Sequence, residues 1–225
     1  MKGSMDTDAA LATRLSRDLD GAFPALVAAH ADRLYSIVLR LLGDRRDAEE
    51  VAQDALVRAY RAMAGYPGER VASLKLRPWL ASIAVNLARN RRRRLDDRNP
   101  PNQLEPMLDG GFDLPTDAAA WGAPGSTADR HETQRELAAA LLRLNVTVRA
   151  AVILRHLDGL SLAETAAALG RPEGTIKAQV HRGLRELRAI LEDAAERGGG
   201  TDSPSATTTV SMRAAPYPAA LEAAR

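Results

Sequence analysis

Apolar residues recur every three or four positions through most of the chain, and no stretch alternates apolar and polar residues over the length of a strand. A period of 3.6 residues is that of an amphipathic helix with one buried face. The 225 residues are enough for one medium domain or two small ones. We therefore predict an all-α protein. The first and longest periodic run carries Leu26, Val27, Leu34, Ile37, Val38 and Leu41.

Turn-forming residues divide the first half of the chain into three predicted helices. The first helix runs from about residue 23 to residue 42, where Gly43 and Asp44 stop it. A second helix starts near Asp47 and ends before the Gly- and Pro-containing segment 65–68. Pro78 suits the first turn of a third helix. This pattern predicts an N-terminal helical bundle over residues 22–95.

The charge of +2 is unevenly distributed along the chain. Residues 26–94 carry +7, residues 95–130 carry −5 and residues 131–192 carry +2. Residues 96–130 also contain five prolines and no helical period, so we predict a long, acidic, flexible linker there. The basic blocks on either side indicate contact with a polyanion. Outside these blocks, residues 1–21 are predicted as an N-terminal extension and residues 193–225 as a disordered tail. Met5 is an alternative start, which would make residues 1–4 a cloning remnant.

A helix-turn-helix pattern lies within the C-terminal segment 131–192. Small Ala166 is followed after four residues by Gly170 and after six more by apolar Ile176. These offsets allow two helices to cross closely at a tight turn, as in DNA-binding proteins. An α-hairpin with a solvated basic face is the alternative. The predicted inner stripe of the second helix is Ile176, Val180, Leu184, Leu187 and Leu191, and its outer face presents Thr175, Lys177, Ala178, His181, Arg182, Arg185 and Arg188.

A basic run ends the third predicted helix, where five arginines fall within residues 89–94. Phosphates would neutralise such a run, although a solvated helix end has the same composition. The helix is entered by a loop that holds aromatic and cationic side chains, a combination suited to unstacked bases. For Trp79 at the start of the helix, packing in the core is an equally good interpretation. The loop residues are Tyr66, Arg70, Lys75 and Arg77.

The second predicted helix carries the opposite charge. Asp47, Glu50 and Asp54 share one face at 3.6 residues per turn. DNA binding would not need an acidic face, so these residues are either solvated or meet a basic protein surface.

Nothing in the sequence indicates catalysis. The absence of cysteine excludes a disulfide scaffold, a cysteine zinc site and a cysteine nucleophile, and it fits a cytoplasmic location. The four histidines lack metal-ligand spacing, and no glycine-rich phosphate loop is present. No apolar run approaches the ~20 residues that span a bilayer. We expect a protein that is not an enzyme, with no catalytic residue, no cofactor, no metal and no membrane segment.

Three ordered motifs together resemble the extracytoplasmic-function (ECF) sigma factors, the small two-domain members of the bacterial housekeeping-type sigma family. The resemblance covers about residues 22–94 and 133–192. It rests on the acidic stretch 47–55, on Trp79, Leu80, Ile83, Ala84 and Asn86, and on the helix-turn-helix that ends with residues 174–177, His181 and Arg182.

The resemblance implies an alternative sigma factor that binds core RNA polymerase and promoter DNA and stabilises the melted −10 strand. Region 2 would be residues 22–95, and region 4, residues 131–192, would also meet the β flap. An anti-sigma factor would regulate the chain. The implied contacts with the clamp helices of the β′ subunit are Asp47, Glu50, Gln53 and Asp54. Those with the −10 element are Tyr66, Arg77, Trp79, Asn86, Arg89, Asn90, Arg91 and Arg93. Those with the −35 element are Thr175, Lys177, Ala178, His181, Arg182 and Arg185.

Two further expectations accompany the resemblance. The stretch 66–79 is several residues longer than in the family, so the −10 base preference is not carried over. The acidic linker would pass through the active-site cleft and RNA exit channel of the polymerase. A one-component helix-turn-helix regulator that binds duplex DNA without polymerase is the alternative function, and a purely protein-binding module is a third.

Overall fold

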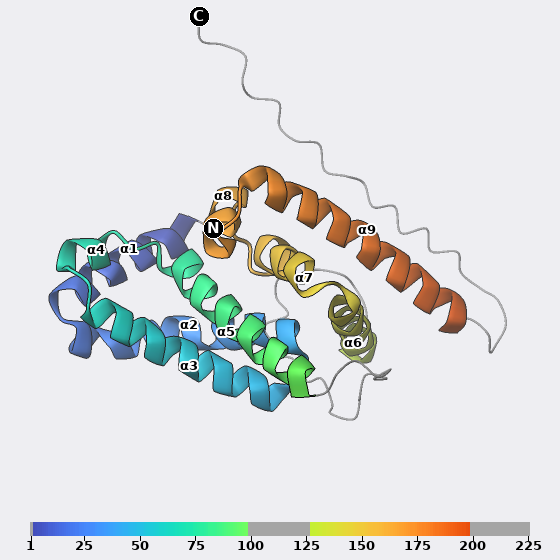
Figure 1. Ribbon diagram of the computed structural model, residues 1–225. Coiled ribbons are helices and arrows are strands. Elements are labelled where there is room, and N and C mark those ends of the chain that lie inside the picture. Colours follow the sequence, from blue (N-terminus) through green and yellow to red (C-terminus); the bar gives the residue numbers. More distant parts are fainter. Residues whose placement is uncertain (1, 99–126, 199–225) are drawn as a thin grey trace, which may run out of the picture.

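A computed structural model describes residues 2–98 and 127–198 of the chain (Figure 1). Every regular element in these two ranges is helical, which confirms the all-α prediction. The first range contains α1 (Lys2–Arg17), α2 (Leu19–Leu42), α3 (Arg45–Ala64), α4 (Gly68–Ala72) and α5 (Leu76–Arg98). The second contains α6 (Thr127–Arg143), α7 (Val146–Val152), the π-helical turn η2 (Ile153–Leu157), α8 (Leu162–Leu169) and α9 (Glu173–Gly198).

Local sequence sets the boundary between α2 and α3. Gly43 adopts the left-handed conformation with φ of +79° and donates its backbone N–H to the carbonyl of Leu39. Glycine adopts this φ without the steric cost that a Cβ brings. Asp44 then caps α3 by accepting a hydrogen bond from the backbone N–H of Asp47 at 2.7 Å. The predicted break at Gly43 and Asp44 is confirmed.

The N-terminal helices form a bundle in which α2, α3 and α5 lie side by side (Figure 1). Its core is built mainly from aliphatic side chains. Residues 1–21 are more than an extension, because α1 packs on α2 and α4 and buries Leu11, Ala12 and Leu15. The spacing of Leu11 and Leu15 is one helical turn, so both side chains point to the same face.

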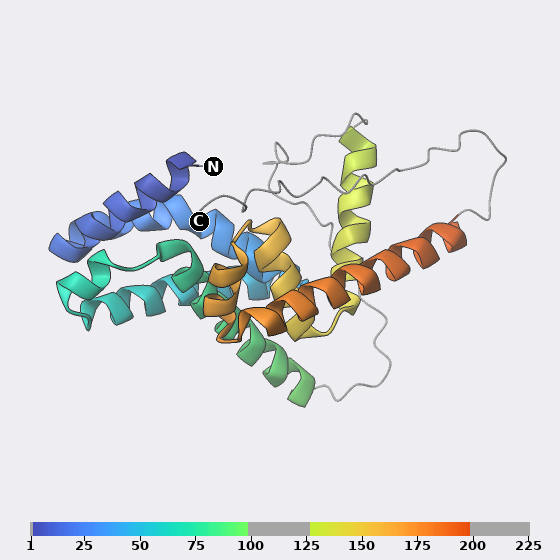
Figure 2. The ribbon, with the colours of Figure 1, turned by 90° about the horizontal axis from the view of Figure 1, so that it is seen from above.

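Two predicted boundaries in the C-terminal half differ from the structure. Helix α6 begins at Thr127, within the predicted linker 96–130, and α9 continues to Gly198, into the predicted tail 193–225. Helix α9 has 26 residues. Figure 2 shows α6 standing at a steep angle to α9, which runs past it. The linker segment 99–126 and the tail segment 199–225 lie outside the described residues.

The two helical domains also pack directly against each other. Helix α5 contacts α8, and α2 contacts α6, α7 and η2. One continuous apolar cluster contains buried side chains from both halves, among them Leu34 and Leu80 of the first and Leu154 and Leu160 of the second. The two domains therefore form a closed arrangement, in which they share an apolar core in addition to being connected through the chain.

Candidate nucleic-acid interface

The helix-turn-helix consists of α8, a tight turn and α9. Ser161 and Glu164 cap α8 reciprocally: the Ser161 N–H donates to the Glu164 carboxylate at 2.8 Å, and the Glu164 N–H donates to Oγ of Ser161 at 3.2 Å. These bonds lower the pKa of Glu164. At the turn, Gly170 has φ of +62°, and Ile176 is fully buried. The predicted roles of the turn glycine and the apolar plug are confirmed.

Helix α9 separates a buried stripe from a basic exposed face. Five of the six residues predicted to contact the −35 element are exposed, and Thr175 is half-buried. One residue of the predicted inner stripe is wrong, because Leu184 is 42% exposed. Gly183 faces inward instead, against the side chains of Val148 and Val152. Glycine at this position lets α9 approach α7 more closely than a larger side chain would. The exposed five are Lys177, Ala178, His181, Arg182 and Arg185.

The aromatic residues predicted at the −10 element lie together at the start of α5. The rings of Tyr66 and Trp79 have centroids 6.4 Å apart, and the Arg70 guanidinium carbon lies 3.8 Å from the Tyr66 centroid. Trp79 is half-buried and packs against the core, which agrees with the core interpretation of this side chain. Part of this long stretch forms α4, which α1 covers and whose Val71 is buried.

The remaining predicted −10 residues divide by exposure along α5. Asn86, Asn90 and Arg93 are exposed. Arg89 is half-buried, and its Nε and Nη2 atoms have no hydrogen-bond partner among the described residues. Burial lowers the pKa of Arg89, and the nearby guanidinium of Arg171, in the turn before α9, adds to this effect.

Arg91 joins the two predicted binding surfaces of the first domain. From α5 its Nε donates to the Asp47 carboxylate at 2.9 Å, and its Nη2 donates to Glu50 at 3.0 Å. The hydrogen bond to Asp47 is the main reason why the pKa of Arg91 is raised. Asp47 itself is buried. Two of the predicted polymerase contacts thus hold an arginine of their own chain, while Gln53 and Asp54 remain exposed on α3.

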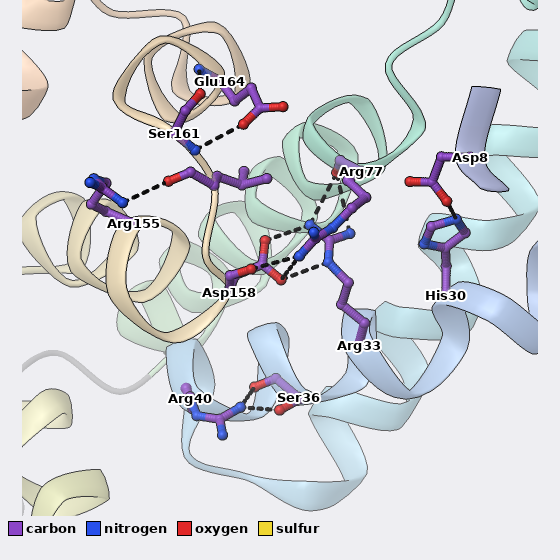
Figure 3. Close-up of polar contacts among 11 residues, drawn as sticks. Asp8, His30, Arg33, Ser36, Arg40, Arg77, Arg155, Asp158, Ser161 and Glu164 are labelled. Carbon is purple, nitrogen blue, oxygen red and sulfur yellow. Dashed lines mark hydrogen bonds and ion pairs between the residues drawn. The ribbon is translucent and has the colours of Figure 1, made fainter. Parts of the chain in front are cut away.

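Arg77 lies at the contact between the domains (Figure 3). Its Nη2 donates to the backbone carbonyl of Asp158 at 2.7 Å, and its own carbonyl accepts from Nη2 of Arg33 at 3.2 Å. Arg33 also donates to both carboxylate oxygens of Asp158, from Nε at 2.6 Å and from Nη2 at 2.5 Å. Sequence reasoning missed Arg33 and Asp158 because they are 125 residues apart and neither belongs to a motif.

Residues 2–98 and 127–198 contain no group of three or more His, Cys, Asp or Glu side chains arranged to hold a metal ion. Among the helices described, none is long and apolar enough to cross a membrane. The exposed chemistry of this part of the chain is therefore that of a basic helix-turn-helix face, an aromatic and cationic loop, and a small acidic face.

Comparison with known proteins agrees with this geometry. Residues 26–98 match the family Sigma-70 region 2, and residues 134–187 match Sigma-70, region 4. The ECF RNA polymerase sigma factor SigW of Bacillus subtilis is 31% identical over 175 residues, which are 76% of this chain and 90% of SigW.

Two solved structures share the fold. CnrH, solved in complex with the cytosolic domain of CnrY, aligns with a TM-score of 0.58 at 24% identity and covers 83% of this chain and 97% of its own. The sigma factor RpoE from Bartonella quintana, solved with the anti-sigma factor NepR, aligns with a TM-score of 0.54 at 24% identity, over 76% of this chain and 96% of its own. The order of the two matched regions and the length of the match to SigW show that the chain belongs to the ECF sigma factors of RNA polymerase.

Proposed function

We propose that this sigma factor binds core RNA polymerase in the cytoplasm and directs it to promoters by contacting the −35 element with α9 and the −10 element with α5 and the preceding loop. The exposed basic face of α9, opposite a buried stripe and directly after the Gly170 turn, supports this proposal most strongly. Arginine and lysine on such a helix can reach guanine edges and phosphates in the major groove. The chain acts by binding and positioning, while the polymerase performs nucleotidyl transfer.

On the polymerase side, we assign the clamp helices of the β′ subunit to the acidic face of α3 and the β flap to region 4. Gln53 and Asp54 are the exposed members of this face, whereas Asp47 and Glu50 already bind Arg91. Gln53 and Asp54 therefore contribute most of the contact in this proposal. An anti-sigma factor is the proposed regulator, as NepR is the partner named with the Bartonella quintana relative.

Reconstitution with purified core polymerase tests the proposal. We expect the wild-type chain to give transcription from promoters identified by transcript mapping after overexpression. Gln53→Ala combined with Asp54→Ala should weaken core binding and leave binding of the isolated chain to duplex −35 DNA unchanged. Asp32→Ala removes an exposed carboxylate from α2 and serves as the matched control. Absence of stable core binding by the wild-type chain at moderate salt would refute the function, and equal core affinity of all variants would refute the assignment of the α3 face.

A further inference from the structure

The contact between the domains is fastened by a buried carboxylate. Asp158 follows η2 in the second domain, and its side chain is 4% exposed. It receives two hydrogen bonds from Arg33 of α2, while its backbone carbonyl receives one from Arg77 of α5. A two-pronged contact between a guanidinium and a carboxylate is among the stronger polar interactions in proteins. We refer to Arg33, Arg77 and Asp158 as the interdomain latch.

The closed arrangement brings the two proposed DNA-reading surfaces too close together to read a promoter. Arg89 of α5 and Arg171, which lies two residues before α9, are near enough to interact electrostatically. The −35 and −10 elements are separated by about 25 base pairs, or roughly 85 Å at 3.4 Å per base pair. A chain in which α5 packs on α8 cannot contact both elements at once. Residues 99–126 join the domains, and a segment of that length reaches at most about 95 Å, which permits the required separation.

Closure also carries an opposing cost. It places the Arg89 and Arg171 guanidiniums near each other, although two buried nitrogens of Arg89 have no hydrogen-bond partner among the described residues. Removing the partners of a buried ion pair from water is costly as well. Separation of the domains would relieve the repulsion between Arg89 and Arg171 and hydrate the Arg33–Asp158 pair. The latch therefore acts against a repulsive contact in the same interface, and this balance suits an equilibrium that a binding partner can shift.

From these contacts we propose that the interdomain latch holds the free chain in a closed, autoinhibited form, and that it must open before the −10 and −35 elements are contacted together. The proposal rests on the proposed sigma function. Most of the predicted α9 reading face is exposed in the closed form, so a short duplex carrying only the −35 element should bind without opening. Closure should weaken only the binding of a promoter whose −10 and −35 elements are contacted at the same time. A tenfold preference for the closed form would lower apparent promoter affinity about tenfold.

The chain contains no cysteine, so two introduced cysteines can be labelled specifically to measure the distance between the domains. We would attach a donor and an acceptor dye to Ala72→Cys on α4 and Ala163→Cys on α8, two exposed positions in different domains. They lie close together in the closed form, because Lys75, three residues after Ala72, is near enough to Glu164 to interact electrostatically. Asp158→Asn removes the latch charge at nearly constant volume. Asp193→Asn is the matched control, because Asp193 pairs with Arg197 within α9 and away from the interface.

We expect high energy transfer in the free wild-type chain and in Asp193→Asn, and lower transfer in Asp158→Asn with unchanged helical circular dichroism. Arg33→Gln should also lower transfer, and the double variant Arg33→Gln with Asp158→Asn should lower it no further than either single change. In reconstituted holoenzyme, Asp158→Asn should increase promoter occupancy at limiting sigma factor by up to about tenfold and leave −35 duplex binding unchanged.

The latch is refuted if free wild-type chain already shows low transfer, if Asp158→Asn keeps the wild-type value, or if the effects of the two latch substitutions add in full. These outcomes are independent of transcription. A wild-type chain that closes as expected but never supports promoter-dependent transcription would instead refute the proposed function.

Discussion

The buried guanidinium of Arg149 gives the sharpest test of how the closed arrangement is stabilised. This side chain on α7 is 4% exposed and donates to three carbonyls: Leu41 at 2.5 Å, Leu142 at 2.5 Å and Leu144 at 2.9 Å. It therefore satisfies the ends of α2 and α6 together. Burial lowers the pKa of Arg149 from its ordinary value to about 10, with a smaller contribution from Arg92.

The expected effect of Arg149→Met follows from these two facts. Three carbonyls in buried or part-buried hydrogen bonds lose their donor at about 2 kcal/mol each, a total of about 6 kcal/mol. Removal of the buried charge recovers about 3 kcal/mol, since the lowered pKa corresponds to 1.36 kcal/mol per pKa unit. The free energy of unfolding should therefore fall by about 3 kcal/mol.

Urea denaturation followed by circular dichroism measures this change. Arg155→Met is the matched control from the next element, because the half-buried Arg155 makes a single bond of 3.2 Å to the carbonyl of Leu160. We expect the control to lose about 1 kcal/mol or less. If Arg149→Met loses no more than the control, then the three carbonyls obtain water when the guanidinium is absent, and the reasoning fails.

Three other predictions concern packing, pH and DNA binding. A Cβ at Gly183 would lie 2.5 Å from a Val152 methyl carbon, so Gly183→Ala should reduce stability by about 1–3 kcal/mol in a thermal melt, whereas Gly174→Ala, with open space around it, should not. Burial lowers the pKa of His30 in the folded chain, so the unfolded chain takes up its proton first, and the urea midpoint should fall as pH drops below about 6.5, with a smaller fall in His30→Gln. Arg182→Ala should weaken −35 binding by roughly 1–3 kcal/mol in a fluorescence anisotropy titration, and unchanged affinity would remove Arg182 from the reading face.

The elements that could be predicted from sequence are those that depend on neighbouring residues. Gly43 and Gly170 mark helix ends because a single residue type suits a positive φ, and the spacing from Ala166 to Ile176 is sufficient to indicate the helix-turn-helix. The sequence predicts only an extension where α1 forms, because only a short apolar stretch marks this helix and its packing depends on contacts with α2 and α4.

Charged residues were harder to assign than apolar ones. Composition indicates that arginine seeks an anion, but it does not distinguish a phosphate from a carboxylate of the same chain. The sequence predicts that Arg91 contacts DNA and that Asp47 contacts polymerase, yet the fold pairs the two residues with each other across α3 and α5. No pattern in the sequence indicates the ion pair between Arg33 and Asp158, because it forms only where the two domains pack against each other.

Arg77 combines both difficulties, and a last prediction separates its two roles. Sequence predicts that it contacts the −10 element, while in the closed form it donates to the Asp158 carbonyl. Each phosphate contact on a single strand contributes about 0.7 to the slope of log affinity against log salt. In the Asp158→Asn background, where the latch is already weakened, Arg77→Ala should reduce this slope by about 0.7 for promoter DNA melted at the −10 element. An unchanged slope would restrict Arg77 to the latch, because a residue that acts only in closure cannot alter the number of phosphates contacted in the open complex.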